Sequence, residues 1–124
     1  MQKYILLYSV ILIKALSGSV DEYIPRIQTF IDDGKYLQAN EVFELAIKEY
    51  DANAALYFIG GTVAVKLDRL DDANKYHIKA IELDNNNDKY RLAQGKLSVL
   101  KNAMNDAKEL EDAVIKSVSG MIEG

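Results

Sequence analysis

The chain has 124 residues, 49% hydrophobic and 27% charged, a balance that fits one folded domain and excludes wholesale disorder. Its net charge of −4 argues against a broad nucleic-acid-binding surface, because such surfaces depend on clustered Lys and Arg. The sequence has no cysteine, which excludes disulfides, thiolate metal sites and cysteine catalysis.

Residues 1–19 differ from the rest of the chain. An apolar run at residues 4–13 follows Lys3, and small residues follow Lys14. This order is typical of a secretory signal peptide, and the run is shorter than the ~20 residues of an ordinary membrane span. The alternative is a retained apolar N-terminal helix that packs against the next helices, a partner or a membrane. The first interpretation predicts the secretory pathway and the endoplasmic reticulum lumen; the second predicts a cytoplasmic or membrane-associated protein.

From residue 20 onward the sequence repeats with a period of 34. Two columns are identical in all three copies, and four more are apolar throughout. The identical columns are Ala39, Ala73 and Ala107, and Ile47, Ile81 and Ile115. A fixed period of this length is typical of stacked helical units. The repeats span residues 20–53, 54–87 and 88–121.

Each repeat is expected to form two helices joined by a polar turn. The turns are predicted at residues 32–35, 67–69 and 101–102, and the junctions between repeats at residues 51–53 and 84–88. Asn and Asp suit these junctions because their side chains bond to nearby backbone and cap the next helix. Pro25 belongs in a first turn, so the first helix is expected to begin near Tyr23.

The middle copy resembles the tetratricopeptide repeat family. It has the family's aromatic residue at its fourth position (Tyr57), glycine at the eighth (Gly61), and alanine at the twentieth and twenty-seventh (Ala73 and Ala80). Gly61 and Ala73 are small where two helices cross, so the backbones can approach closely. The resemblance implies an all-α right-handed solenoid of three helical hairpins, preceded by the apolar N-terminal segment.

The resemblance also implies a concave face lined by the first helix of each repeat. Its positions form an apolar floor crossed by a polar line, which suits an apolar peptide segment. They are Ile24, Gln28, Ile31, Phe58, Thr62, Val65, Lys89, Leu92, Lys96 and Val99. The alternative is that packing between repeats buries the apolar members. We expect Phe58→Glu to weaken peptide binding without loss of helix.

Some family members hold a C-terminal carboxylate with five polar side chains. Only Lys89 matches that set in this chain; the other four positions are Ile24, Gln28, Ile59 and Ala93. Binding of acidic chaperone tails by this clamp is therefore not expected.

No catalytic or metal-binding constellation emerges from the sequence. His77 is the only histidine and occupies a packing position, and no second His or Cys completes a zinc site. The run at residues 84–88 has Lys89 where a calcium loop needs glycine. We therefore expect a non-enzymatic protein without metal or cofactor.

Two functions remain open. One is a protein-binding module for partner proteins or unfolded peptides, similar to the repeat region of lumenal DnaJ-type co-chaperones. The other is a structural scaffold subunit of a larger assembly, anchored by residues 1–19. Neither involves nucleic acid, and contact with a membrane would come only through the N-terminal segment.

Overall fold

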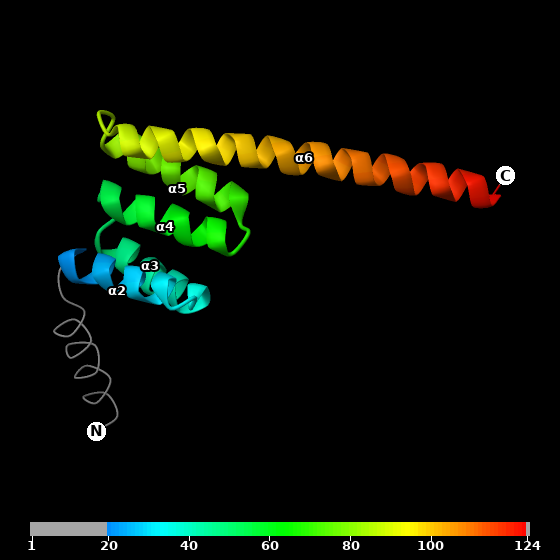
Figure 1. Ribbon diagram of the computed structural model, residues 1–124. Coiled ribbons are helices and arrows are strands. Elements are labelled where there is room, and N and C mark those ends of the chain that lie inside the picture. Colours follow the sequence, from blue (N-terminus) through cyan, green and yellow to red (C-terminus); the bar gives the residue numbers. More distant parts are fainter. Residues whose placement is uncertain (1–19, 124) are drawn as a thin grey trace, which may run out of the picture.

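A computed structural model describes residues 20–123, which form five α-helices without any strand. They are α2 (Val20–Asp32), α3 (Tyr36–Glu49), α4 (Ala54–Lys66), α5 (Leu70–Leu83) and α6 (Asp88–Glu123). Helices α2 and α3 form one hairpin, α4 and α5 a second, and the start of α6 packs on the second hairpin (Figure 1). The all-α repeat architecture is confirmed. The segment predicted as a signal peptide or apolar helix lies outside the described residues.

The two hairpin turns have the same geometry at equivalent positions. Gly34 (φ 73°) and Asp68 (φ 60°) adopt the left-handed conformation that ends a helix. The next backbone N–H returns to the preceding helix in both turns: Lys35 N donates to Phe30 O at 2.8 Å, and Arg69 N donates to Ala64 O at 2.8 Å. These contacts satisfy carbonyls at the helix ends, so the predicted turns at residues 32–35 and 67–69 are confirmed.

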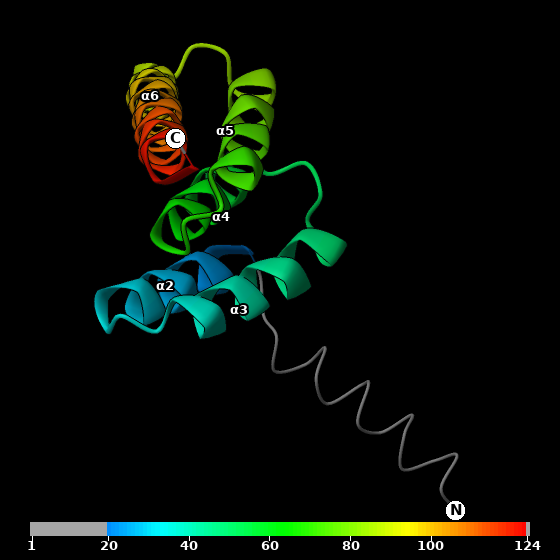
Figure 2. The same ribbon diagram turned by 90° about the vertical axis from the view of Figure 1, so that its right-hand side faces the viewer.

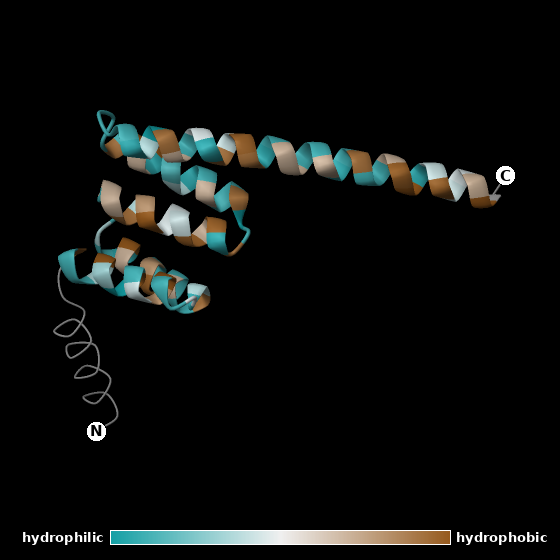
Figure 3. Ribbon diagram, in the orientation of Figure 1, coloured by the Kyte–Doolittle hydropathy of each residue, from teal (hydrophilic) through white to brown (hydrophobic). Residues whose placement is uncertain are grey.

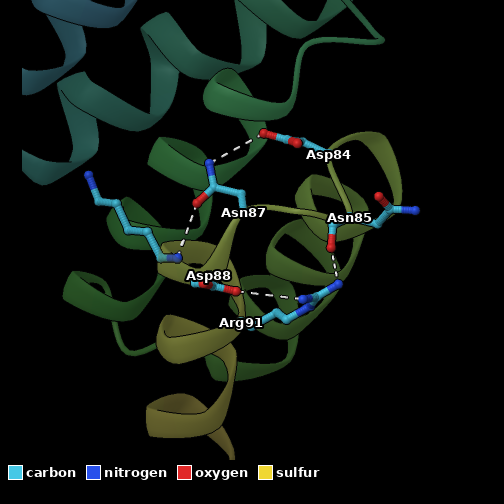
Figure 4. A network of polar contacts seen from close by, with 6 residues as sticks. Asp84, Asn85, Asn87, Asp88 and Arg91 are labelled. Atoms are coloured by element: carbon cyan, nitrogen blue, oxygen red, sulfur yellow. Dashed lines mark hydrogen bonds and ion pairs between the residues drawn. The ribbon is translucent and has the colours of Figure 1, made fainter.

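Asn and Asp side chains organise the junctions between hairpins, as the sequence predicted. Asn53 Oδ1 accepts a hydrogen bond from Leu56 N at 2.9 Å and caps α4. Before α6, Asn87 Oδ1 accepts from Lys89 N at 3.1 Å, and Asn87 Nδ2 donates to Asp84 Oδ2 at 3.3 Å (Figure 4). The side chains of Asp84 and Asn87 therefore cap the start of α6.

Arg91 fixes the same junction from within α6. Its guanidinium donates to the backbone carbonyl of Asn85 and lies 3.6 Å from Asp88 Oδ1 (Figure 4). The side chain that replaces the family's aromatic residue at this position therefore holds the α5–α6 loop against the first turn of α6.

The core lies where the two hairpins meet. Phe43, fully buried in α3, presses against Gly60 in α4, and an ideal Cβ on Gly60 would lie 2.2 Å from the Phe43 ring. The Phe43 ring also meets Tyr76 edge-on, with centroids 4.9 Å apart. The next residue, Gly61, faces His77 of α5, and an ideal Cβ on Gly61 would lie 2.2 Å from the His77 ring. The predicted close crossing at Gly61 is confirmed, and Gly60 makes a second crossing that the sequence did not reveal.

Helix α2 begins earlier than expected. Pro25 lies inside it, not in its first turn. Tyr23 and Ile27, on either side of Pro25, are both buried in the core. Their packing holds the helix in place around a residue that lacks a backbone N–H.

The expected third hairpin is wrong, because α6 runs unbroken through Lys101 and Asn102. Asn102 is equivalent to Gly34 and Asp68, yet among the described non-glycine residues only Asp68 has a positive φ. Residues 103–110 are rich in Ala, Met, Lys, Glu and Leu, which favour helix. Lys101 also extends from the helix to Asp71 of α5, with Nζ 2.8 Å from Oδ1. Continuation of the helix therefore competes successfully with a turn.

The second half of α6 projects beyond the hairpins (Figure 1), and a view turned by 90° shows α6 nearly end-on beside α4 and α5 (Figure 2). The third-repeat members of the core columns are therefore solvent-exposed: Met104, Ala107, Leu110 and Ile115. Within residues 20–123, no helix has the length and apolar content that crossing a membrane requires.

Candidate functional site

A hollow of about 220 Å³ lies between α4 and α6. Helical spacing forms its walls, because residues three and four apart share one face of a helix. Thr62, Val65 and Lys66 contribute from α4, and Ala93, Lys96, Leu97 and Leu100 from α6, with His77 of α5 between them.

His77 is buried in a contact between helices. Its ring stacks on Phe58 with centroids 5.5 Å apart and occupies the space left by the missing side chain of Gly61. Neither imidazole nitrogen has a hydrogen-bond partner among the described protein groups. Burial lowers the pKa of His77, and the nearby Phe58 backbone offsets part of that effect. The neutral ring therefore acts as a packing group, as the sequence predicted.

Phe58 forms the adjoining edge of this region. Its ring stacks on Tyr90 of α6 at 4.7 Å between centroids as well as on His77, and Lys89 Nζ lies 5.2 Å from its centroid. Phe58 thus joins α4, α5 and α6. Phe58→Glu would disturb this packing, so it is no longer a clean probe of peptide binding.

The charge around the hollow is positive. Lys66 and Lys96 line it and are exposed. No carboxylate lies among its lining residues. Thr62 Oγ1 donates to the Phe58 carbonyl at 3.2 Å. The arrangement combines apolar walls with flexible ammonium groups, which suits an apolar ligand that also carries negative charge.

Three predicted residues meet in this hollow: Thr62, Val65 and Lys96. Sequence reasoning missed Lys66, Ala93 and Leu100, which come into register only when α6 lies against α4. Each of these residues lies three or four positions from a predicted residue on the same helix, and this spacing could have revealed them.

The remaining predicted residues lie elsewhere. Ile24 and Ile31 are partly buried against the core of the first hairpin, and Gln28 Nε2 donates to Asp32 Oδ1 at 2.8 Å on the surface. Leu92 and Val99 lie together on another side of α6, in a shallow depression shared with Lys96. The predicted face is therefore divided between the hollow at α4 and α6 and the depression on α6.

A larger hollow of about 690 Å³ lies on the second-helix side of the repeats. Its lining includes Ile47, Tyr57, Tyr76 and Lys79, and none of the predicted face residues. Across residues 20–123, no group of three or more His, Asp or Glu side chains is placed to hold a metal ion.

Comparison with known proteins places the fold. No protein-family model and no curated protein matches the chain. Among solved structures, it is similar to the second tetratricopeptide domain of Spaghetti (RPAP3) bound to the HSP90 peptide SRMEEVD, with 25% identity and a TM-score of 0.64 over 77% of this chain and 88% of that one. It is also similar to MamA (residues 41 to the end) from Desulfovibrio magneticus RS-1, with 20% identity and a TM-score of 0.66 over 87% of this chain and 60% of that one. Neither structure supports the narrower resemblance to DnaJ-type co-chaperones.

Proposed function

The chain has the tetratricopeptide-repeat fold, and from that premise we propose that it is a non-enzymatic module that binds a peptide segment of another protein in the hollow between α4 and α6. The observation that carries the proposal is the chemistry of this hollow: apolar walls from Val65, Ala93 and Leu100, bordered by Lys66 and Lys96. Apolar clefts with a few charged groups at the edge are typical of peptide sites.

The preferred ligand is a short segment with apolar side chains and at least one carboxylate. The domain of Spaghetti was solved with a peptide that contains both kinds of residue. The five-residue carboxylate clamp is not reproduced here, because Ile59 is buried and Ala93 is half-buried at two of its positions. We therefore expect recognition through the lysines beside the hollow, without a requirement for a free C-terminus.

Lys66→Glu tests this proposal. The probe is a labelled peptide of alternating leucine and glutamate, and fluorescence anisotropy measures its Kd with the full chain. Reversal of one charge beside the hollow should raise Kd roughly fivefold. Lys79→Glu, an exposed position that lines the other hollow, is the matched control and should leave Kd unchanged. Equal Kd values for both variants and the parent would refute the proposed site.

The location of the module rests on residues 1–19, as does the choice between a secretory co-chaperone and an anchored scaffold. We propose the secretory pathway, because an apolar run followed by small residues has the order of a signal peptide. N-terminal sequencing of the mature protein should find a start just after Ser17 or Ser19. An intact Met1 would favour the scaffold that keeps its apolar segment.

A further inference from the structure

We propose that α6 pairs with α6 of a second copy of the chain, antiparallel, through an apolar stripe that runs along most of its length. The stripe is a separate surface from the hollow between α4 and α6, although Lys96 borders both. The proposal therefore goes beyond the peptide-binding function.

The stripe consists of large and small apolar residues at helical spacing, interrupted by one lysine. Its members between residues 92 and 114 are Leu92, Lys96, Val99, Ala103, Ala107, Leu110 and Val114, and Met121 continues it on the same side of α6. The four large side chains between residues 92 and 114 are 54–70% exposed, although they recur on one side of the same helix. Figure 3 shows hydrophobic positions recurring along α6 into the part that projects from the hairpins. A stripe of this length, left open to water, marks an interaction surface.

The stripe is turned away from the contacts that α6 makes with the hairpins. Tyr90 and Leu97 are buried on the inner side, and residues two positions apart point in nearly opposite directions. Leu92 and Val99 therefore point outward. An added Cβ at Gly95, between them, would meet no atom within 4 Å, so another helix can approach closely here.

The spacing of the stripe between residues 92 and 114 fits a second copy of the chain. The steps from Leu92 to Val114 are four, three, four, four, three and four residues, which read the same in both directions about Ala103. A two-fold axis at Ala103 would therefore bring every stripe position between residues 92 and 114 opposite another: Leu92 opposite Val114, Val99 opposite Ala107, and Ala103 opposite its own copy. Self-complementarity of one patch is what a two-fold dimer requires.

Charge favours the same register. Lys96 lies within one half of the stripe and Glu111 borders the other half, beside Leu110. In the antiparallel pair, Lys96 of one copy lies next to Glu111 of the other, and the symmetry makes this contact twice. A parallel pair would instead place Lys96 beside Lys96 and Glu111 beside Glu111, which repel.

Residues 20–123 of the same chain do not cover the stripe. To do so, the second half of α6 would have to fold back at Asn102, but α6 is helical there and Lys101 is tied to Asp71 from the helical conformation. Residues 92 and 114 of one straight helix lie ~33 Å apart at 1.5 Å per residue. Only another chain brings them together.

Disulfide trapping tests the pairing directly, because the chain has no cysteine of its own. Full chains with Leu92→Cys are mixed with full chains with Val114→Cys and oxidised. A crosslinked mixed dimer is expected, with little product from either variant alone. Asp112→Cys replaces Val114→Cys as the control: it lies two residues away on the opposite side of α6 and should not crosslink to Leu92→Cys.

Charge exchange provides a second measurement on the full chain. By sedimentation equilibrium, Lys96→Glu should weaken the dimer at least about tenfold, and Lys96→Glu with Glu111→Lys should restore it, because attraction across the pair is re-formed. Three results would overturn the proposal: a monomer at all concentrations, a Leu92→Cys homodimer that indicates parallel helices, or a Leu92→Cys/Val114→Cys double variant that crosslinks only within one chain. The comparison of Lys66→Glu with the parent chain at one protein concentration is a separate test of the hollow, because Lys66 lies outside the stripe.

Discussion

The second hairpin and the second half of α6 carry the same repeat pattern but have different structures. Ala73 is fully buried where α5 crosses α4, whereas Ala107, its equivalent, is exposed on the part of α6 that projects beyond the hairpins. The difference arises at a single turn. Asp68 takes a left-handed conformation and reverses the chain, and Asn102 continues the helix. A repeat pattern thus specifies which residues can form a core, and the turn decides whether they do so within one chain.

Truncation of a core side chain gives the largest expected difference between the two regions. Phe43→Ala should lower the free energy of unfolding by about 3–5 kcal/mol, because Phe43 is fully buried between α4 and Tyr76. Val114→Ala, at a half-exposed position of α6, should change it by less than about 0.5 kcal/mol in dilute protein. Urea denaturation measures both. A loss of several kcal/mol for Val114→Ala would mean that a third hairpin buries this residue within the monomer.

Replacement of Gly60 and of Gly95 by alanine is expected to change the stability of the fold in opposite directions. Gly60→Ala should destabilise the fold by about 1–3 kcal/mol, since its Cβ would overlap the Phe43 ring. Gly95→Ala should stabilise it by up to about 1 kcal/mol, because the position is helical and open and alanine favours helix. Thermal unfolding of the two variants provides the readout. Destabilisation by Gly95→Ala would reveal a close neighbour on that face.

The smallest effect concerns pH and is confined to the second hairpin. Because burial lowers the pKa of His77 in the folded protein, the unfolded chain binds the proton more readily. The neutral ring therefore contributes to the free energy of unfolding above the ordinary histidine pKa of about 6.5, and this contribution is lost as the pH falls below that value. Stability should therefore decrease between pH 7 and pH 5, and less so in His77→Gln. Identical pH profiles would show that His77 titrates normally.

Much of the fold was predictable because local chemistry and packing agree in the first two repeats. Gly34 suits a left-handed turn, Asn53 suits a cap, and the small Gly61 suits a helix crossing. The prediction of a third hairpin was wrong because Asn102 is compatible with both a turn and a helix, and the helix-favouring residues 103–110 that follow it continue the helix. Lys101 adds an ion pair with Asp71 of α5, a contact between helices that the sequence does not display.

The candidate site was predicted less well than the fold. Of the predicted face, Thr62, Val65 and Lys96 line the hollow, whereas Phe58 packs on His77 and Tyr90. An aromatic side chain on the first helix of a repeat can face the groove or the neighbouring repeat, and only the position of α6 distinguishes the two.

Lys96 lies at the border of the hollow and of the stripe. A peptide carboxylate and Glu111 of a second copy would compete for the same ammonium group. If dimer formation lowers the affinity for the peptide by some factor, thermodynamic linkage requires that bound peptide lowers the affinity of the dimer by the same factor. The apparent peptide affinity would then fall as the concentration of the chain rises, so that abundance itself regulates the module.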